Sequence, residues 1–172
     1  MKKLIFFIVV LFSFTSFAQK STSPNMAFGA QVGLAVPVGD LSDYANMGFG
    51  ILGSYIYGLN QNFDLVASIG FISFSMKADG VSGHTFPFIA GGRYYFTNQP
   101  TRFYGLLNIG TYVTSVSDNF GDSVTSTDFG FSIGGGFKYP LNQKITLDGN
   151  AKYNHASDYG WIDFFIGIDY AL

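Results

Sequence analysis

The stretch Ile145-Thr-Leu-Asp-Gly-Asn-Ala-Lys-Tyr-Asn154 alternates, residue by residue, between two kinds of side chain. One phase is bulky and apolar and holds Ile145, Leu147, Ala151 and Tyr153. The other phase is polar and holds Thr146, Asp148, Asn150, Lys152 and Asn154. Successive side chains of a β-strand point to opposite faces, so this period of two predicts a strand with one apolar and one polar face.

The same alternation recurs in seven other segments of the chain. They cover residues 26–37, 47–59, 63–71, 84–97, 102–117, 128–139 and 162–172. Three connections are short and share an Asn-Gln pair, at 60–62, 98–100 and 142–144, whereas the other four are longer. The longer ones hold seven of the eleven Asp residues, namely Asp40, Asp43, Asp79, Asp118, Asp122, Asp128 and Asp158. Short turns at one end and longer polar loops at the other are typical of barrels that span the outer membrane.

The composition indicates which strand face meets lipid. Only 12% of the residues are charged, and there are 22 Gly and no Cys. A face that meets water is expected to be rich in charge, but the second face carries mostly Gly and small polar residues. The bulky face therefore points into lipid, and an open edge there would leave backbone groups unpaired, so the first and last strands pair. The sequence predicts an all-β fold, an eight-stranded antiparallel up-and-down transmembrane β-barrel; a soluble barrel of the lipocalin type is the alternative.

Two expectations about particular side chains follow from this phase assignment. Bulky aromatic residues beside the short turns or the C-terminus are expected to form an outward girdle: Tyr57, Phe63, Phe96, Phe103, Tyr139 and Tyr170. Charged residues on the inner phase at a similar depth are expected to form an ion-pair cluster: Asp64, Arg93, Lys138, Asp148 and Asp169. Lys138 and Asp148 flank one short turn and are expected to be near-diagonal neighbours.

Residues 1–18 have the pattern of an export signal. Lys2 and Lys3 form a basic start, residues 4–12 are uninterruptedly apolar, and Ser16-Phe-Ala18 gives a small-x-small pattern before Gln19. We expect this segment to be removed, leaving residues 19–172 as one barrel domain. The remaining chain has seven basic residues against eleven acidic ones, which argues against a nucleic-acid partner.

The chain resembles the small outer-membrane β-barrel proteins of the OmpA, OmpX and OmpW type from Gram-negative bacteria. The resemblance rests on Gly33-Leu-Ala-Val-Pro-Val-Gly-Asp40 and on Gly167-Ile-Asp-Tyr-Ala-Leu172, which looks like the family's C-terminal assembly signal except that it ends in Leu rather than Phe. It implies a monomer in the outer membrane, in contact with lipid and lipopolysaccharide and inserted by the barrel-assembly machinery. It also implies a structural, adhesive or surface-interaction role without catalysis.

A lipid A deacylase is one alternative function. His155-Ala-Ser157 is similar to the His-x-Ser pair of such outer-membrane enzymes, with Asp163 in the place of the acid on the last strand. This sequence departs from them in having Asp158 for Asn and Asp163 for Glu. His155 and Ser157 fall on the outer phase and Asp163 on the inner one, and an inward acid cannot orient an outward His.

Narrow transport of small apolar molecules is the second alternative, and it would be favoured by an interior lined with Leu52, Ile56, Val66, Ile72 and Leu106.

The Asp residues of 118–122 are interpreted as solvated loop acids, because the ligand series of a calcium loop is missing. Gly134-Gly-Gly136 is interpreted as small residues beside interior side chains, since no Lys-Ser/Thr follows. The sequence thus predicts no catalytic, cofactor-binding or metal-binding residues.

Overall fold

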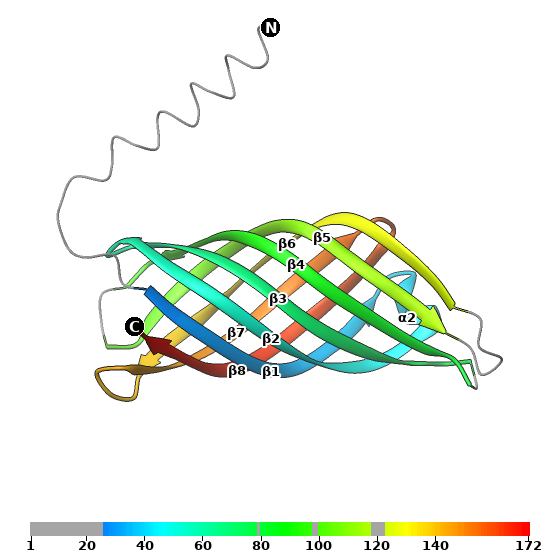
Figure 1. The fold of residues 1–172 in the computed structure, drawn as a ribbon, viewed down its shortest axis with the longest axis horizontal. Helices are drawn as coiled ribbons and strands as arrows, with labels where there is room; N and C mark the ends of the chain where they lie inside the picture. The colour runs from blue at the N-terminus through cyan, green and yellow to red at the C-terminus, as the bar shows by residue number, and fades with distance from the viewer. Residues whose placement is uncertain (1–25, 79, 98–99, 118–122) are drawn as a thin grey trace, which may run out of the picture.

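The computed structural model describes residues 26–78, 80–97, 100–117 and 123–172, which form eight strands and one helical turn (Figure 1). In chain order these are β1 (Met26–Val38), α2 (Leu41–Tyr44), β2 (Ala45–Asn60), β3 (Phe63–Met76), β4 (Ser82–Tyr95), β5 (Arg102–Ser117), β6 (Ser123–Pro140), β7 (Ile145–Ala156) and β8 (Tyr159–Ala171). No helix among these residues has the length and apolar character needed to cross a membrane. The predicted export signal at 1–18 lies outside the described residues.

The strands close into a barrel, which confirms the predicted architecture. Each strand pairs antiparallel with its neighbours in sequence, and β1 completes the cylinder against β8. That closing ladder places Val32 opposite Ile166 and Ala27 opposite Ala171. At its end the Leu172 N–H donates to the Met26 carbonyl at 2.9 Å. In the part of the chain that the structure describes, the sheet therefore has no open edge along the apolar belt.

The apolar side chains point outward and the polar side chains point into the barrel, as predicted. Along β1 the Val32 side chain is 58% exposed on the outside, whereas its neighbour Gln31 is 5% exposed. The six girdle aromatics lie on the outer phase; Phe96, Phe103, Tyr139 and Tyr170 are exposed, and Tyr57 and Phe63 are half-buried. The alternative of a soluble barrel with a greasy interior is therefore wrong.

Strand β6 begins earlier than the sequence pattern indicated. It starts at Ser123, five residues before the predicted segment 128–139, and pairs with β5 from the Ser117–Ser123 register onward. Residues 123–127 are exposed on both faces of the strand, and four of the five are Ser or Thr. Such a segment does not alternate between apolar and polar side chains, so the sequence pattern did not reveal it.

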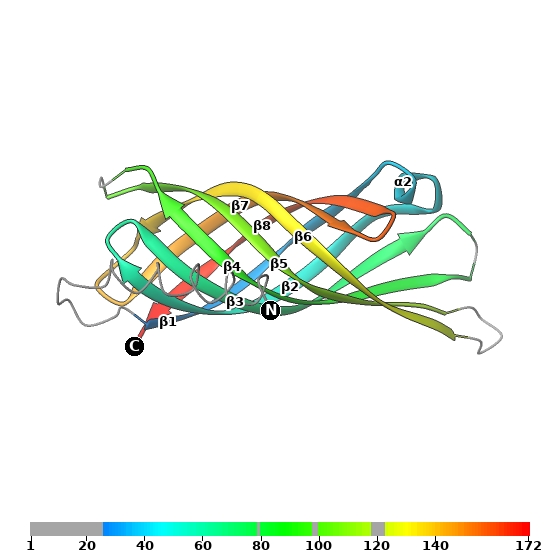
Figure 2. The same cartoon turned by 90° about the horizontal axis from the view of Figure 1, so that it is seen from above.

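The two ends of the barrel differ, and both views show it (Figures 1 and 2). One end, the turn side, carries the β2–β3, β4–β5 and β6–β7 connections, the start of β1 and the C-terminus; the other, the loop side, carries α2 and the other connections. The prediction that all four loop-side connections are longer is wrong for β7–β8, which is a two-residue turn of Ser157 and Asp158. At the turns, the Asn60 and Asn142 side chains each accept the N–H two residues on, both at 2.8 Å. The repeated Asn-Gln pair thus builds the same Asx turn twice; residues 98–99 of the third turn lie outside the described residues.

Candidate functional site

The barrel interior at the turn side holds the predicted ion-pair cluster. Arg93 on β4 donates from Nη1 to Asp148 on β7 at 2.6 Å and lies 3.8 Å from Asp169 on β8. Lys138 on β6 lies 3.0 Å from Asp169 and 3.5 Å from Asp64 on β3. All five side chains are buried. We call them the turn-side cluster, and together they tie five of the eight strands across the lumen.

The pairing within this cluster differs from the expectation for Lys138 and Asp148. These residues are not diagonal neighbours but lie directly opposite each other in the β6–β7 register. Their ion pairs nonetheless run across the lumen, Lys138 to Asp64 and Asp169, and Asp148 to Arg93. The Lys138 side chain is long enough to reach over the narrow interior. Although Lys138 and Asp148 are opposite each other on adjacent strands, each forms its ion pairs with other residues.

Two inward tyrosines, which were not predicted from the sequence, complete the cluster. Tyr95 donates its hydroxyl to Asp64 and Tyr104 donates to Asp148, both at 2.6 Å. The Arg93 guanidinium lies 4.9 Å from the Tyr104 ring centre, within cation–π range. Tyr95 lies two residues from Arg93 and therefore on the same face of β4. This shared face could have predicted its inward position from the sequence.

The middle of the interior combines apolar side chains with paired amides and hydroxyls. Asn150 donates to Gln31 at 3.2 Å, and Asn108 donates to Ser132 at 2.9 Å. The five apolar residues expected to line a transport path are all buried: Leu52, Ile56, Val66, Ile72 and Leu106. They do not line the lumen from end to end: Ile72 packs in the cluster of Phe74 and Trp161, Leu106 packs with Tyr95 and Tyr104, and the turn-side cluster fills the lumen at the turn side.

A second polar group, the loop-side cluster, lies nearer the loops. Asp163 on β8 lies 3.4 Å from Lys152 and accepts a hydrogen bond from Asn154 at 2.9 Å, both partners being on β7. Above it, the Trp161 ring meets the rings of Tyr112 and Phe74 edge to face, at 5.2 and 6.1 Å between ring centres. All three rings are buried. This aromatic layer closes the interior toward the loop side.

The structure does not bring the proposed hydrolase residues together. Asp163 lies inside the barrel, bonded to Asn154, as its phase predicted. His155 lies outside, 5.6 Å from the Phe131 ring centre and within 3.4 Å of the Tyr153 hydroxyl. Ser157 is exposed in the β7–β8 turn with a positive φ of 52°. Acid, base and nucleophile therefore do not share one site.

The remaining motifs have plain explanations where the structure describes them. A Cβ at Gly134 would lie 2.7 Å from the Lys152 Cβ, and one at Gly136 would lie 2.6 Å from the Tyr104 hydroxyl. These glycines therefore make room for interior side chains, as interpreted. Residues 118–122 lie outside the described residues; within those described, no group of three His, Cys, Asp or Glu side chains is arranged to hold a metal ion.

A cavity of about 540 Å³ opens at the loop side, above the aromatic layer. We call it the mouth cavity. Phe74 and Trp161 form its buried floor, and its walls come from α2, from the upper parts of β5 and β6 and from the β7–β8 turn. Two carboxylates line it, Asp128 on β6 and Asp158 in the turn.

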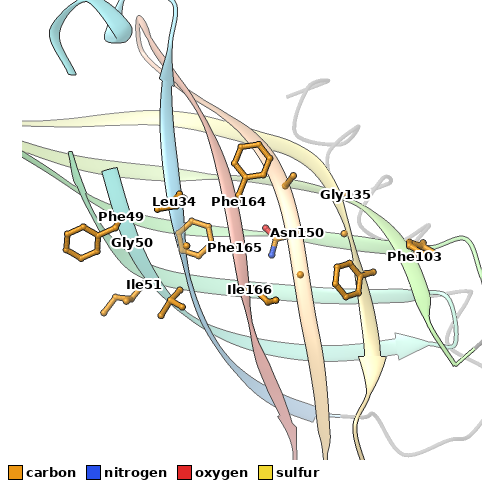
Figure 3. Close-up of a pocket in the computed structure, with 16 residues that line it drawn as sticks. Leu34, Phe49, Gly50, Ile51, Phe103, Gly135, Asn150, Phe164, Phe165 and Ile166 are labelled. Carbon is orange, nitrogen blue, oxygen red and sulfur yellow. The ribbon is translucent and has the colours of Figure 1, made fainter. Parts of the chain in front are cut away.

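The outer wall has a depression of about 910 Å³ (Figure 3). Leu34, Phe49, Ile51, Phe164 and Ile166 line one part of it, and it continues past Gly135 toward Phe103. It lies in the apolar belt of the barrel.

A closed wall with a bulky apolar exterior and a narrow interior filled by ion pairs defines an integral membrane β-barrel. The chain matches the model of the family described as outer membrane protein beta-barrel domain over residues 5–170, and it belongs to that family. It is accordingly a protein of the Gram-negative outer membrane.

Solved structures show the same fold at low sequence identity. Neisserial surface protein A, from Neisseria, is 18% identical with a TM-score of 0.69, over 86% of this chain and 97% of that one. Ail of Yersinia pestis is 18% identical with a TM-score of 0.58, over 87% and 97%. OprG of Pseudomonas aeruginosa is 15% identical with a TM-score of 0.60, over 90% and 98%. The comparison with curated proteins gave no match.

Proposed function

We propose that this barrel is a sealed outer-membrane scaffold that acts through its loop side, in a structural, adhesive or other surface-interaction role. The filled interior is the observation that carries the proposal. The turn-side cluster, the amide and apolar layer, the loop-side cluster and the aromatic layer follow one another along the lumen. A solute crossing the barrel would have to separate buried ion pairs, which is strongly unfavourable.

The upper part of β6 supports the surface-interaction role. Residues 123–129 pair with β5 on one side, but the β6–β7 ladder starts only at Gly130 opposite Ala156. Among the described residues, nothing pairs with 123–129 on the β7 side. Such an edge is a ready template for an extended segment of another protein, because its backbone donors and acceptors are available.

The charge of the loop side indicates which surface ligands this barrel would disfavour. One solved neighbour, Ail, has been crystallised with the heparin analogue sucrose octasulfate. Here the described loop-side residues include Asp40, Asp43, Asp128 and Asp158 against Lys77. This balance repels a sulfated polyanion, so the proposal does not extend that ligand to this chain.

The remaining partners belong to the same proposal. Phospholipid and lipopolysaccharide surround the apolar belt, the barrel-assembly machinery inserts the chain, and the barrel is a monomer that binds no nucleic acid and catalyses no reaction. A monomer suits the uninterrupted ladder between β1 and β8, which needs no second chain to complete it.

Planar-bilayer recording tests the sealed scaffold. Purified, folded protein is expected to add no steady conductance above that of protein-free bilayers, while a general porin added to the same bilayer conducts. The double variant Arg93→Ala and Lys138→Ala removes both cations of the turn-side cluster and is expected to raise the frequency of current events. Steady, salt-dependent conductance of the unmodified barrel would contradict the proposal.

Lateral transport of small apolar molecules is a second candidate, favoured by Pro87 on β4. The β3–β4 pairing runs from Ile69–Phe88 directly to Ile72–Thr85 and skips the two residue pairs between them. Proline has no N–H to donate to a ladder, so the wall is weakened at this point. Thr85, two residues above on the same face, lines the mouth cavity. The gap therefore lies next to the floor of that cavity.

Uptake of the apolar dye N-phenylnaphthylamine by cells that express the barrel tests this candidate. Pro87→Ala restores an N–H and is expected to lower the uptake rate toward that of cells without the protein. Pro140→Ala, at the exposed turn-side end of β6, is the matched control and is expected to leave the rate unchanged. Equal uptake with and without the barrel would reject lateral transport and leave the sealed scaffold in place.

A further inference from the structure

We propose that the mouth cavity is a binding site for an amphipathic organic cation, a ligand with an apolar or aromatic body and an ammonium group. Its volume of about 540 Å³ falls within the range of small-molecule sites, about 300–1,000 Å³. It is a recess in the barrel mouth rather than a gap between strands, because the aromatic layer closes it below. Binding there does not require that the interior conduct.

The floor and walls of the cavity favour an apolar body. Phe74 and Trp161 form a rigid floor, since both are buried and their rings meet edge to face. Met76 and Val124 add aliphatic surface from β3 and β6. A flat apolar group seated on this floor would remove surface from water on both sides, which is the main source of affinity in such recesses.

The charges of the cavity select a cation. Asp128 and Asp158 bring carboxylates from two different elements to the same recess, and no Lys, Arg or His is among the described residues that line it. Asp128 is held in place by the Ser126 hydroxyl, which donates to it at 2.9 Å. An ammonium group placed between the two acids is attracted by both, whereas an anion of equal size is repelled by both.

Aromatic side chains at the rim add to this selection. Tyr44 on α2 and Tyr159 at the start of β8 line the cavity, and both are partly exposed to solvent. The faces of aromatic rings attract cations, and cages of such rings recognise quaternary ammonium groups. Aromatic rings and carboxylates therefore both favour an organic ammonium ion over a neutral or anionic ligand.

Trp161 allows a direct test, because it is the single Trp of the chain and lies at the cavity floor. The full-length barrel is folded into nanodiscs of zwitterionic phosphatidylcholine and titrated with phenyltrimethylammonium, with benzenesulfonate as the anion of similar size. We expect a saturable change in Trp161 emission with the cation and none with the anion. Raising the salt concentration is expected to weaken the binding.

Substitutions assign the effect to the cavity. Asp128→Asn with Asp158→Asn removes both lining carboxylates and is expected to weaken binding at least tenfold. Asp43→Asn removes the same charge from α2 outside the cavity lining and is expected to leave binding within twofold. Mobility of the unboiled protein on a gel confirms that each variant is folded. Equal binding of cation and anion, equal loss in the Asp43→Asn variant, or no saturable change with the unmodified barrel would each overturn the proposal.

Discussion

Replacing Arg93 by Met is the most direct test of the electrostatic organisation of the interior. Met keeps much of the length and apolar volume of the Arg side chain but removes the charge. Asp148 is fully buried, and among the described residues Arg93 is the one cation paired with it. Asp169 loses its weaker contact at 3.8 Å but keeps Lys138 at 3.0 Å. The loss of stability in Arg93→Met therefore comes mainly from Asp148, which is left without a counter-ion.

The magnitude follows from leaving that carboxylate without a counter-ion. Breaking a buried ion pair by removing one partner costs about 3–5 kcal/mol. Neutralising the second partner as well removes the stranded charge, so the double variant Arg93→Met with Asp148→Asn is expected to recover most of the loss. The Asn side chain can still accept the hydroxyl of Tyr104, which now donates to Asp148. We expect the double variant to lie within about 2 kcal/mol of the unmodified barrel.

Urea unfolding in lipid vesicles measures these differences. Trp161 emission and the gel mobility of unboiled samples report the folded fraction independently. Lys144→Met removes an exposed cation whose Nζ lies 3.5 Å from the Tyr170 hydroxyl, and it is expected to change the unfolding free energy by under about 0.5 kcal/mol. An Arg93→Met barrel within about 1 kcal/mol of the unmodified one would refute the view that the cluster is a coupled buried network.

Three further predictions concern the wall of the barrel. Gly136→Ala brings a Cβ against the Gly149 carbonyl oxygen and to 2.6 Å from the Tyr104 hydroxyl, and it is expected to cost about 1–3 kcal/mol in the same urea assay. Gly53→Ala, whose nearest neighbour lies at 3.9 Å, is expected to be within about 0.5 kcal/mol of the unmodified barrel. Ile166→Arg places a charge on the lipid face near the middle of β8 and is expected to destabilise the barrel by about 2–4 kcal/mol; a neutral effect would mean that this face does not meet hydrocarbon. The chain has no Cys, so single substitutions report the two faces separately. Phe164→Cys, on the outer face, is expected to react with a membrane-soluble maleimide, whereas Phe165→Cys, on the inner face, is expected to be protected. The reverse pattern would mean that the two faces are exchanged.

The fold was predictable because its main determinant is a regular alternation. Residues such as Val32 and Gln31 differ so clearly in polarity that their phase assigns one to lipid and the other to the interior. The members of the turn-side cluster followed from the same phase combined with their distance from the short turns. Burial of charge then requires partners, so their proximity could be expected without coordinates.

Other features depend on geometry that the alternation does not contain. The ionic partner of Lys138 is set by side-chain reach across the lumen, and its register neighbour Asp148 is instead paired with Arg93. Tyr95 and Tyr104 were missed because only charged residues were considered for the interior cluster, although both tyrosines lie on the inner phase. The mouth cavity could not be foreseen because α2, β6 and the β7–β8 turn, which lie far apart in sequence, build its walls.

The turn-side cluster has a consequence for how the chain becomes a barrel. Asp64 and Arg93 lie on β3 and β4, among the first four strands, whereas Lys138, Asp148 and Asp169 lie on β6, β7 and β8. During synthesis and insertion, the two cations have their full set of carboxylates only after the last strand docks beside the first. A nascent sheet whose strands slip by one residue would turn these side chains toward lipid. The full set of ion pairs inside the lumen therefore forms only in the closed barrel with the correct register.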